Sequence, residues 1–415
     1  MKKKKIFVVL IFIISIAIVF SFFAYWKHQE TEKEKTQETQ RIELIKEIKS
    51  HYSSNVIVVK DTNLYKDNDG KKESVGTISK DQVISLDEIE ITENTKYFYS
   101  KDLDMYISYK DVEPFSEEFI IDKRYENYLL FDENVVTKDK VNLIKDGNIS
   151  YTLNFAIDRP IIMKEDNGYY IEYFNQLYFI SSDDVANTYE NSNNTLEEAS
   201  SVPVTCYHFI YLGQEDYCDE IICHSKEQIE SHFKYLTQNN YFTINTTELR
   251  YFIEGKLRLP KNSILVTIDD GPRAENFIPL LEQYKINATL FLVSGWYPKE
   301  QFASPYMEIA SHTHDLHTGG KCPGGQGGWI KCLEHDKLLA DFTTSRETLD
   351  GTEAFCYPFY EYNNYTISVL KEAGFKMGFA GGQKRVTKGR DLFQIPRITI
   401  HSTTTLEEYI NFVKP

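Results

Sequence analysis

Two adjacent aspartates at the end of an apolar run are the first residues that could do chemistry. Asp269 and Asp270 follow Ile264–Ile268, which predicts a buried strand, and they precede Gly271 and Pro272. Carboxylates at the end of a buried strand are costly unless they are paired or bind a metal. Because successive strand side chains point to opposite faces, the two cannot flank one glycosidic bond as an equivalent pair. We therefore expect two roles: one carboxylate binds a metal, and the other takes a proton from water.

A cluster of histidines is the second feature with chemical potential. Three of the ten histidines, His312, His314 and His317, lie within six residues, beside an aspartate. Such a cluster favours a metal site over a structural role. On a helix His312 and His317 would diverge by about 140°, so they could converge only from a loop, which Gly319 and Gly320 support. In an extended segment His312 and His314 would share a face instead, so the spacing alone leaves the choice of pair open.

With both clusters in view, the stretch 202–415 resembles the polysaccharide deacetylase family (carbohydrate esterase family 4). The resemblance rests on five ordered stretches: VPVTCYHFIY, which contains Tyr207-His208, then FIEGKLRLPKNSILVTIDDGP, EIASHTHDLH, FCYPFYEYN and QIPRI. The third stretch has the form seen in extracellular poly-N-acetylglucosamine deacetylases. The resemblance implies an α/β fold, a deformed (β/α) barrel with its site at the carboxyl ends of the strands.

The resemblance also implies a role for each matching residue. Asp269 would be the general base, and Asp270, His312 and His317 would bind a divalent metal, leaving His314 as a neighbour. Two imidazoles and a carboxylate suit Zn²⁺ and leave a position for water. The residues implied at the substrate are Tyr357, Pro358, Phe359, Tyr360 and, from the opening strand, His208. A backbone N–H of FCYPFYEYN (355–363), which is the family's third motif, would stabilise the oxyanion.

The third motif departs from the family pattern. Many relatives carry an arginine there, braced against the base, whereas Cys356 and Tyr357 occupy that region here. Arg397 either replaces it or pairs elsewhere. Tyr360 stands where relatives often have glycine, which would narrow the groove. The family's general acid is a late histidine, and His401 is the candidate at that end of the chain, the alternative being a surface histidine.

The N-terminal region predicts a membrane attachment. Four lysines precede the uncharged stretch 6–26, which is long enough to span a bilayer core of about 30 Å. We expect a cytoplasmic basic end (1–5), an uncleaved transmembrane anchor (6–26) and a polar stalk (27–52), with the rest of the chain outside the cell. The alternative is a cleaved signal peptide.

A repeated pattern of short β-type runs follows the stalk. Asn63–Asp67 resembles Asn142–Asp146, and Met105–Val112 resembles Tyr178–Val185. This repetition predicts two small β modules, 53–114 and 115–186, both resembling bacterial SH3-like domains. Such modules either bind cell-wall peptides or act as a spacer. A polar linker (187–201) leads to the deacetylase-like domain (202–415), where strands alternate with helices.

Charge and cysteine content limit the compartment and the partners. The 415 residues carry 46 Lys+Arg against 62 Asp+Glu, a net charge of −16, which argues against nucleic acid as a partner. Six cysteines in an exported chain permit disulfides, and Cys218/Cys223 and Cys322/Cys332 are the expected local pairs.

Together these features predict an extracellular, metal-dependent hydrolase. It would remove N-acetyl groups from N-acetylglucosamine units of an exopolysaccharide or of peptidoglycan. The alternatives are a wall-binding scaffold with an inactive domain and an O-acetyl polysaccharide esterase. The presence of both aspartates, His312 and His317 argues against the scaffold, because drift should remove metal ligands first.

Overall fold

The computed structural model describes residues 21–23, 25–40, 42–43, 46–47, 55–85, 89–91, 97–100, 103–115, 123–192, 196–213, 218 and 220–415. The predicted basic end (1–5) and most of the predicted anchor (6–26) lie outside these residues. Within the described part of the chain, no helix has the length and apolar character needed to cross a membrane. Residues 27–40 of the predicted stalk are helical and have exposed side chains.

Contacts divide the chain into two compact units. The first comprises Met1–Asp122, Val136–Asp158 and Glu172–Asn187, and the second comprises Lys123–Val135, Arg159–Ile171 and Thr188–Pro415. Four strands cross these divisions: β9 (Glu133–Thr137), β12 (Asp158–Pro160), β14 (Gly168–Tyr173) and β16 (Val185–Glu190).

The first unit consists of short antiparallel strands. They are β1 (Asn55–Val58), β2 (Thr62–Asn68), β3 (Lys71–Ile78), β4 (Val83–Ser85), β5 (Ile89–Ile91), β6 (Tyr97–Ser100), β7 (Met105–Ser108), β8 (Val112–Pro114), β10 (Val141–Lys145), β11 (Asn148–Leu153) and β15 (Gln176–Ser181). Strand β1 pairs with β4 and β8, and β3 pairs with both β2 and β11.

The two predicted β modules contain similar elements in the same order. Hairpins β2–β3 and β10–β11 turn at Asp69-Gly70 and Asp146-Gly147, whose four φ angles are positive (52°, 83°, 50° and 76°). A tight hairpin requires this left-handed backbone, which Asp-Gly readily adopts. A strand, a 3₁₀ turn and a further strand then follow in both halves, as β7–η1 (Tyr109–Asp111)–β8 and as β15–η3 (Ser182–Asp184)–β16. Whether these are SH3-like domains stays a prediction.

The second unit contains a nearly closed parallel barrel, which confirms the α/β class. Its eight strands, in spatial order, are β26 (Ile395–Pro396), β25 (Met377–Ala380), β24 (Ala354–Cys356), β23 (Met307–Ser311), β22 (Ala288–Leu292), β21 (Ser263–Asp270), β17 (Val204–Tyr207) and β27 (Ile398–Thr399). The outermost strands of this order, β26 and β27, are separated in the chain by Arg397 alone, which brings the two edges of the sheet together. All eight residues of β21 are buried, as expected for a parallel strand covered on both faces.

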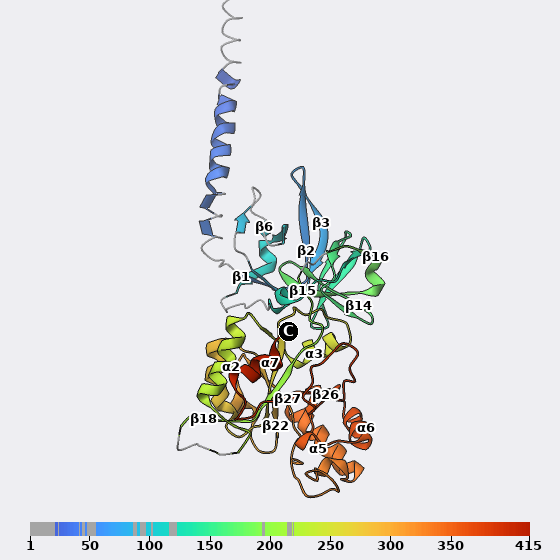
Figure 1. The fold of residues 1–415 in the computed structure, drawn as a ribbon. Helices are drawn as coiled ribbons and strands as arrows, with labels where there is room; N and C mark the ends of the chain where they lie inside the picture. Colours follow the sequence, from blue (N-terminus) through green and yellow to red (C-terminus); the bar gives the residue numbers. More distant parts are fainter. Residues whose placement is uncertain are drawn as a thin grey trace, which may run out of the picture. The chain divides into compact units, whose positions relative to one another are not determined.

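Helices surround the barrel strands (Figure 1). They are α2 (Lys226–Gln238), α3 (Thr246–Ile253), α4 (Ile278–Tyr284), α5 (His335–Thr348), α6 (Asn364–Glu372) and α7 (Leu406–Val413). Short strands β13 (Met163–Glu165), β18 (Phe209–Tyr211), β19 (Cys223–Ser225) and β20 (Phe242–Thr243) complete the unit. Phe233 of α2 and Leu290 of β22 belong to one buried cluster, and Phe342 of α5 and Val369 of α6 to another. Burial of these apolar faces fixes the barrel on which the site stands.

A segment that precedes residue 202 is also part of the second unit. Glu248 in α3 is buried and accepts hydrogen bonds from Arg124 Nε and Nη2 at 3.0 and 2.6 Å and from the Tyr128 hydroxyl at 2.6 Å. It also caps α3 by accepting a bond from the Asn245 backbone N–H at 2.7 Å. A buried carboxylate needs such partners. Residues 123–135 therefore help to stabilise α3.

Candidate active site and metal centre

The carboxyl end of β21 presents the two aspartates in different directions. Asp270 has a φ of 79°, in the left-handed region that strand residues avoid, so its side chain departs from the strand alternation. Its Oδ1 atom lies 3.3 Å from His312 Nε2 and 3.2 Å from His317 Nε2. Burial raises the pKa of Asp270, but the hydrogen bonds and charge of the two imidazoles in their protonated form outweigh it and hold that pKa well below 3.8. Asp270 is therefore ionised where the two histidines converge.

A turn after β23 brings the two histidines together. His312 directly follows β23, and Thr313, with a φ of 81°, reverses the chain so that the His312 and His317 ring centroids lie 4.9 Å apart. The His314 ring instead lies beside Ser294, with Nδ1 3.0 Å from Oγ. Asp341 holds this turn by accepting the backbone N–H groups of His314 and of the next residue, a role that the sequence analysis missed. Of the two pairs left open by spacing, the structure brings His312 and His317 together.

The tautomer of His312 favours metal binding. Its Nδ1 lies 2.8 Å from the Cys356 carbonyl oxygen, which can only accept, so Nδ1 carries the hydrogen. Nε2 then directs its lone pair towards Asp270 Oδ1, a buried atom that has no hydrogen-bond partner among the described residues. A metal-binding imidazole usually donates the N–H of its other ring nitrogen to a carbonyl or carboxylate in this way.

The converging atoms fit a divalent cation. Donor atoms of Asp270, His312 and His317 all lie within 4.8 Å of one another. Asp269 forms similar groups with Cys206 and with Cys356, but burial raises the pKa of both thiols, so they remain protonated and bind a cation poorly. Two nitrogens and one oxygen match the donor set that suits Zn²⁺.

Asp269 is paired with an arginine from the far end of the domain. Arg397 Nη1 and Nη2 donate to the two Asp269 carboxylate oxygens at 2.7 and 2.6 Å, and both side chains are buried. The guanidinium carbon lies 5.5 Å from the Phe291 ring centroid and 5.1 Å from that of Tyr360. Burial raises the pKa of Asp269, but the charge and hydrogen bonds of Arg397 outweigh it and lower that pKa to about 2. Asp269 is therefore an ionised, oriented acceptor beside the metal group.

Comparison with known proteins agrees with this geometry. A family model described as "Polysaccharide deacetylase" matches residues 256–378. The poly-beta-1,6-N-acetyl-D-glucosamine N-deacetylase of Staphylococcus aureus (strain MSSA476) is 30% identical over 201 residues, covering 42% of this chain and 67% of that protein. The chain belongs to the polysaccharide deacetylase family.

Two solved structures are also similar to this deacetylase. A de-N-acetylase from Aggregatibacter actinomycetemcomitans is 24% identical and covers 51% of this chain and 99% of that chain, with a TM-score of 0.44. IcaB from Ammonifex degensii is 21% identical and covers 53% of this chain and 100% of that chain, with a TM-score of 0.44.

The third motif of this chain carries a thiol beside Asp269. Cys356 Sγ accepts a hydrogen bond from Arg397 Nη2 at 2.9 Å and lies 3.5 Å from Asp269 Oδ2. Cys206 Sγ lies 3.6 Å from the same oxygen. The small Cys356 side chain leaves room for the guanidinium of Arg397 to reach the base. Sequence alone did not place these thiols beside Asp269; the available signal was that the two expected disulfides leave Cys206 and Cys356 unpaired.

Both expected disulfides are present, Cys218–Cys223 and Cys322–Cys332. Disulfides persist in oxidising compartments and are rare in the cytosol. They indicate that this part of the chain lies outside the cytoplasm.

The aromatic residues of the third motif point in different directions. Tyr357 is buried, and its hydroxyl donates to the Phe393 carbonyl at 3.0 Å. The Tyr360 hydroxyl lies 2.9 Å from Thr399 Oγ1, inside the barrel, so this side chain covers Arg397 instead of narrowing a groove. The Phe359 ring instead lies 4.6 Å from His317.

The two other predicted histidines, His208 and His401, differ in their relation to Asp269. His208 Nε2 is 4.0 Å from Asp269 Oδ2. Among the described residues His401 forms no ion pair with either aspartate; its backbone carbonyl accepts a hydrogen bond from the Gln228 side chain at 3.0 Å.

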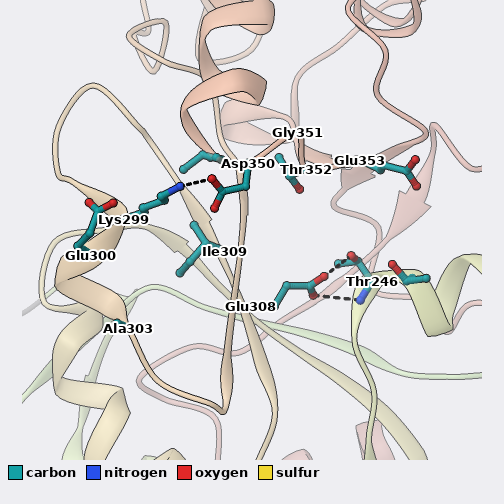
Figure 2. Close-up of a pocket in the computed structure, with 12 residues that line it drawn as sticks. Thr246, Lys299, Glu300, Ala303, Glu308, Ile309, Asp350, Gly351, Thr352 and Glu353 are labelled. Carbon is teal, nitrogen blue, oxygen red and sulfur yellow. Dashed lines mark hydrogen bonds and ion pairs between the residues drawn. The ribbon is translucent and has the colours of Figure 1, made fainter. Parts of the chain in front are cut away.

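A separate hollow of about 550 Å³ lies at the other end of the strands (Figure 2). Glu308, near the start of β23, accepts hydrogen bonds from the backbone N–H and hydroxyl of Thr246 at 3.0 and 2.7 Å, and from the Thr289 hydroxyl at 2.5 Å. Lys299 pairs with Asp350. These charged side chains hold α3 and the loops in place, and they lie at the amino ends of the strands, away from the metal group.

Proposed function

We propose that this chain is a metal-dependent N-deacetylase that removes acetyl groups from N-acetylglucosamine units of an exopolysaccharide or of peptidoglycan. The observation that carries the proposal is the convergence of Asp270, His312 and His317 within 3.3 Å contacts, beside an ionised Asp269. Membership of the deacetylase family and the named substrate of the Staphylococcus aureus relative support the same chemistry.

The proposed mechanism assigns separate tasks to the two aspartates. Asp270, His312 and His317 would hold a divalent cation, most readily Zn²⁺, which when bound would supply Lewis-acid chemistry that makes water more acidic and polarises the acetamide carbonyl. Asp269 takes the proton of the attacking water. Arg397 keeps Asp269 ionised and fixes its orientation through the two-pronged contact.

A backbone N–H of the third motif would stabilise the oxyanion. Tyr357 N–H donates to the Phe379 carbonyl at 3.0 Å and Tyr360 N–H to the Tyr357 carbonyl at 2.9 Å, while Pro358 has no N–H. The Phe359 N–H has no partner among the described residues. We assign it the role of oxyanion donor, because an unpaired, fixed N–H beside the metal suits that role.

The leaving amine requires a proton donor. His401 remains the proposed general acid from the family pattern, and His208 is a second candidate because its Nε2 lies 4.0 Å from Asp269 Oδ2. Replacing each by glutamine, and comparing the loss of acetate release, identifies the donor.

The proposed location is the outer face of the cell membrane. The two disulfides support an exported domain, and the predicted anchor at 6–26 would attach it. The β modules of the first unit would either bind the cell wall or act as a spacer.

Acetate release from poly-N-acetylglucosamine, peptidoglycan and O-acetyl xylan tests the proposal. We expect release from an N-acetylated polymer, its loss in Asp269→Asn with metal binding largely retained, and no loss in Asp336→Asn, where the exposed side chain faces solvent. Release from xylan alone would favour the O-acetyl esterase. Absence of bound metal and of release would favour the scaffold.

A further inference from the structure

A glycine-rich loop closed by a disulfide lies close to the metal residues. This loop, residues 318–334, contains the Cys322–Cys332 bond. Glu361, just after η8 (Pro358–Tyr360), accepts the backbone N–H groups of Gln326 and Gly328 at 2.5 and 2.7 Å. The same carboxylate pairs with Lys331 Nζ at 2.9 Å. A single half-buried side chain thus fixes three points of the loop.

Glycine is required for the loop to close on Glu361. A Cβ atom on Gly325 would lie 1.8 Å from Glu361 Oε1, and one on Gly328 would lie 3.1 Å from Oε2. Gly325 also has a φ of 60°, which favours glycine. The loop backbone and the Glu361 carboxylate therefore fit each other closely.

The closed loop packs on the ring that contacts His317. Cβ atoms built on Gly319 and Gly328 would lie 3.7 and 3.5 Å from the Phe359 ring, so these two glycines face that ring with no side chain between the loop backbone and the ring. The Phe359 ring also contacts the His317 ring, and the two ring centroids lie 4.6 Å apart. His312 is held by its hydrogen bond to a carbonyl, whereas Phe359 supplies packing against His317.

The backbone that carries Phe359 is strained. Phe359 and Tyr360 have φ angles of 58° and 59°, and two successive non-glycine residues in the left-handed region cost about 1–3 kcal/mol each. Such a conformation persists only where its surroundings hold it. Glu361 is the next residue, and its three contacts with the loop fix the end of this turn.

We propose that Glu361 is a positioning residue for the metal centre. By holding the loop 318–334 against Phe359, it fixes the orientation of the His317 imidazole. This inference rests on the proposed metal-dependent function. Groups that orient metal ligands without touching the metal typically change metal affinity by 10–100-fold when removed.

The test measures binding of Zn²⁺ alone to the metal-free full chain, by competition with a chromophoric chelator, for native protein, Glu361→Gln and Glu361→Ala. We expect Glu361→Ala to raise the Zn²⁺ Kd by about 10-fold. Glu361→Gln should have a smaller effect, because one acceptor oxygen remains. Glu372→Ala, which removes a glutamate paired with the exposed His335, is the matched control and should leave the Kd unchanged.

A double-variant cycle separates positioning from general stability. Phe359→Leu removes the Phe359 ring from His317 and leaves the Trp296 ring, 5.4 Å away, in place, so Glu361→Ala should add little further loss of Zn²⁺ affinity in that background. The Co²⁺ absorption spectrum should differ most from the native spectrum in the variants whose Kd rises most, and this result would support the proposal.

Three outcomes would count against these proposals. If Glu361→Ala is folded and binds Zn²⁺ like the native chain, the proposal is overturned; if that variant unfolds, Glu361→Gln decides in the same way. An equal loss in both backgrounds would overturn the route through Phe359. Native protein that binds no Zn²⁺ would instead overturn the proposed function.

Discussion

Replacing Arg397 with methionine would leave a buried carboxylate without its charged partner. Arg397 is completely buried and donates to both oxygens of Asp269, and it also donates to Thr267 Oγ1 at 3.1 Å. Methionine has a comparable length but no charge. After the change, Asp269 would keep weak thiol contacts with Cys206 and Cys356 at 3.6 and 3.5 Å and the His208 imidazole at 4.0 Å, but no charged hydrogen-bond donor.

The expected loss of stability follows from this burial. Removing one partner of a buried ion pair costs about 3–5 kcal/mol, because the remaining charge is desolvated and unpaired. The lowering of the Asp269 pKa from 3.8 to about 2 means that the native site favours the ionised carboxylate by about 2 kcal/mol more than water does. We therefore expect the free energy of unfolding of Arg397→Met to fall by at least about 3 kcal/mol at pH 7.

The double variant Arg397→Met/Asp269→Asn should recover much of this loss, because the neutral amide is less costly to bury than an unpaired carboxylate. Urea unfolding of the metal-free chain measures both, followed by the fluorescence of Trp296 and Trp329, which lie in the barrel unit. Acetate release should be absent in both variants.

The pH dependence gives a second check on the same pair. In the native chain the Asp269 pKa is lowered, so its stabilisation is present above 3.8 and is lost as the pH falls through about 2. In Arg397→Met burial raises that pKa, so the deficit should shrink as the pH falls and Asp269 is protonated. A loss below about 1 kcal/mol, or a double variant no more stable than the single one, would refute the reasoning.

Three further changes test other parts of the structure. Asp270→Asn should weaken Zn²⁺ binding by at least about 10-fold and abolish acetate release, because the anionic ligand is lost; unchanged binding by titration would contradict the metal site. Burial raises the pKa of Glu361, but Lys331 and the loop N–H groups outweigh it and lower that pKa below 4.5. Loop closure should therefore hold above pH 4.5 and fail as the pH falls through the lowered pKa of Glu361. Faster amide hydrogen exchange of the loop would report this opening. Arg124→Met should cost about 1.5–3 kcal/mol in chemical denaturation, because Glu248 loses a charged donor in a buried site, and an unchanged midpoint would argue against this contact.

Local pattern was sufficient for much of the fold and for the identity of the chemical groups. The apolar run Ile264–Ile268 predicts the core of β21, and Ala288–Val293 predicts β22, because buried parallel strands consist of continuous apolar residues. The two disulfides join cysteines that are close in sequence, so spacing identified them. The order of motifs was enough to name Asp269 and the metal residues as candidates.

The choice between equivalent residues depended on tertiary structure. The backbone reversal at Thr313, and not the histidine spacing, brings His317 to His312 and leaves His314 beside Ser294. Spacing could not decide this, because a left-handed φ at a threonine is unfavourable by itself and is stabilised by contacts from elsewhere in the fold.

The partner of Asp269 was also decided by the nearly closed barrel. Arg397 is 128 residues from Asp269 in sequence and reaches it because β26 and β27 bring the two edges of the barrel together. The sequence by itself determined which strands form, which groups could bind metal and which cysteines pair locally. Closure of the barrel decided which arginine meets the base and which thiols surround it, because a buried charge is stable only next to a partner that the whole chain places there.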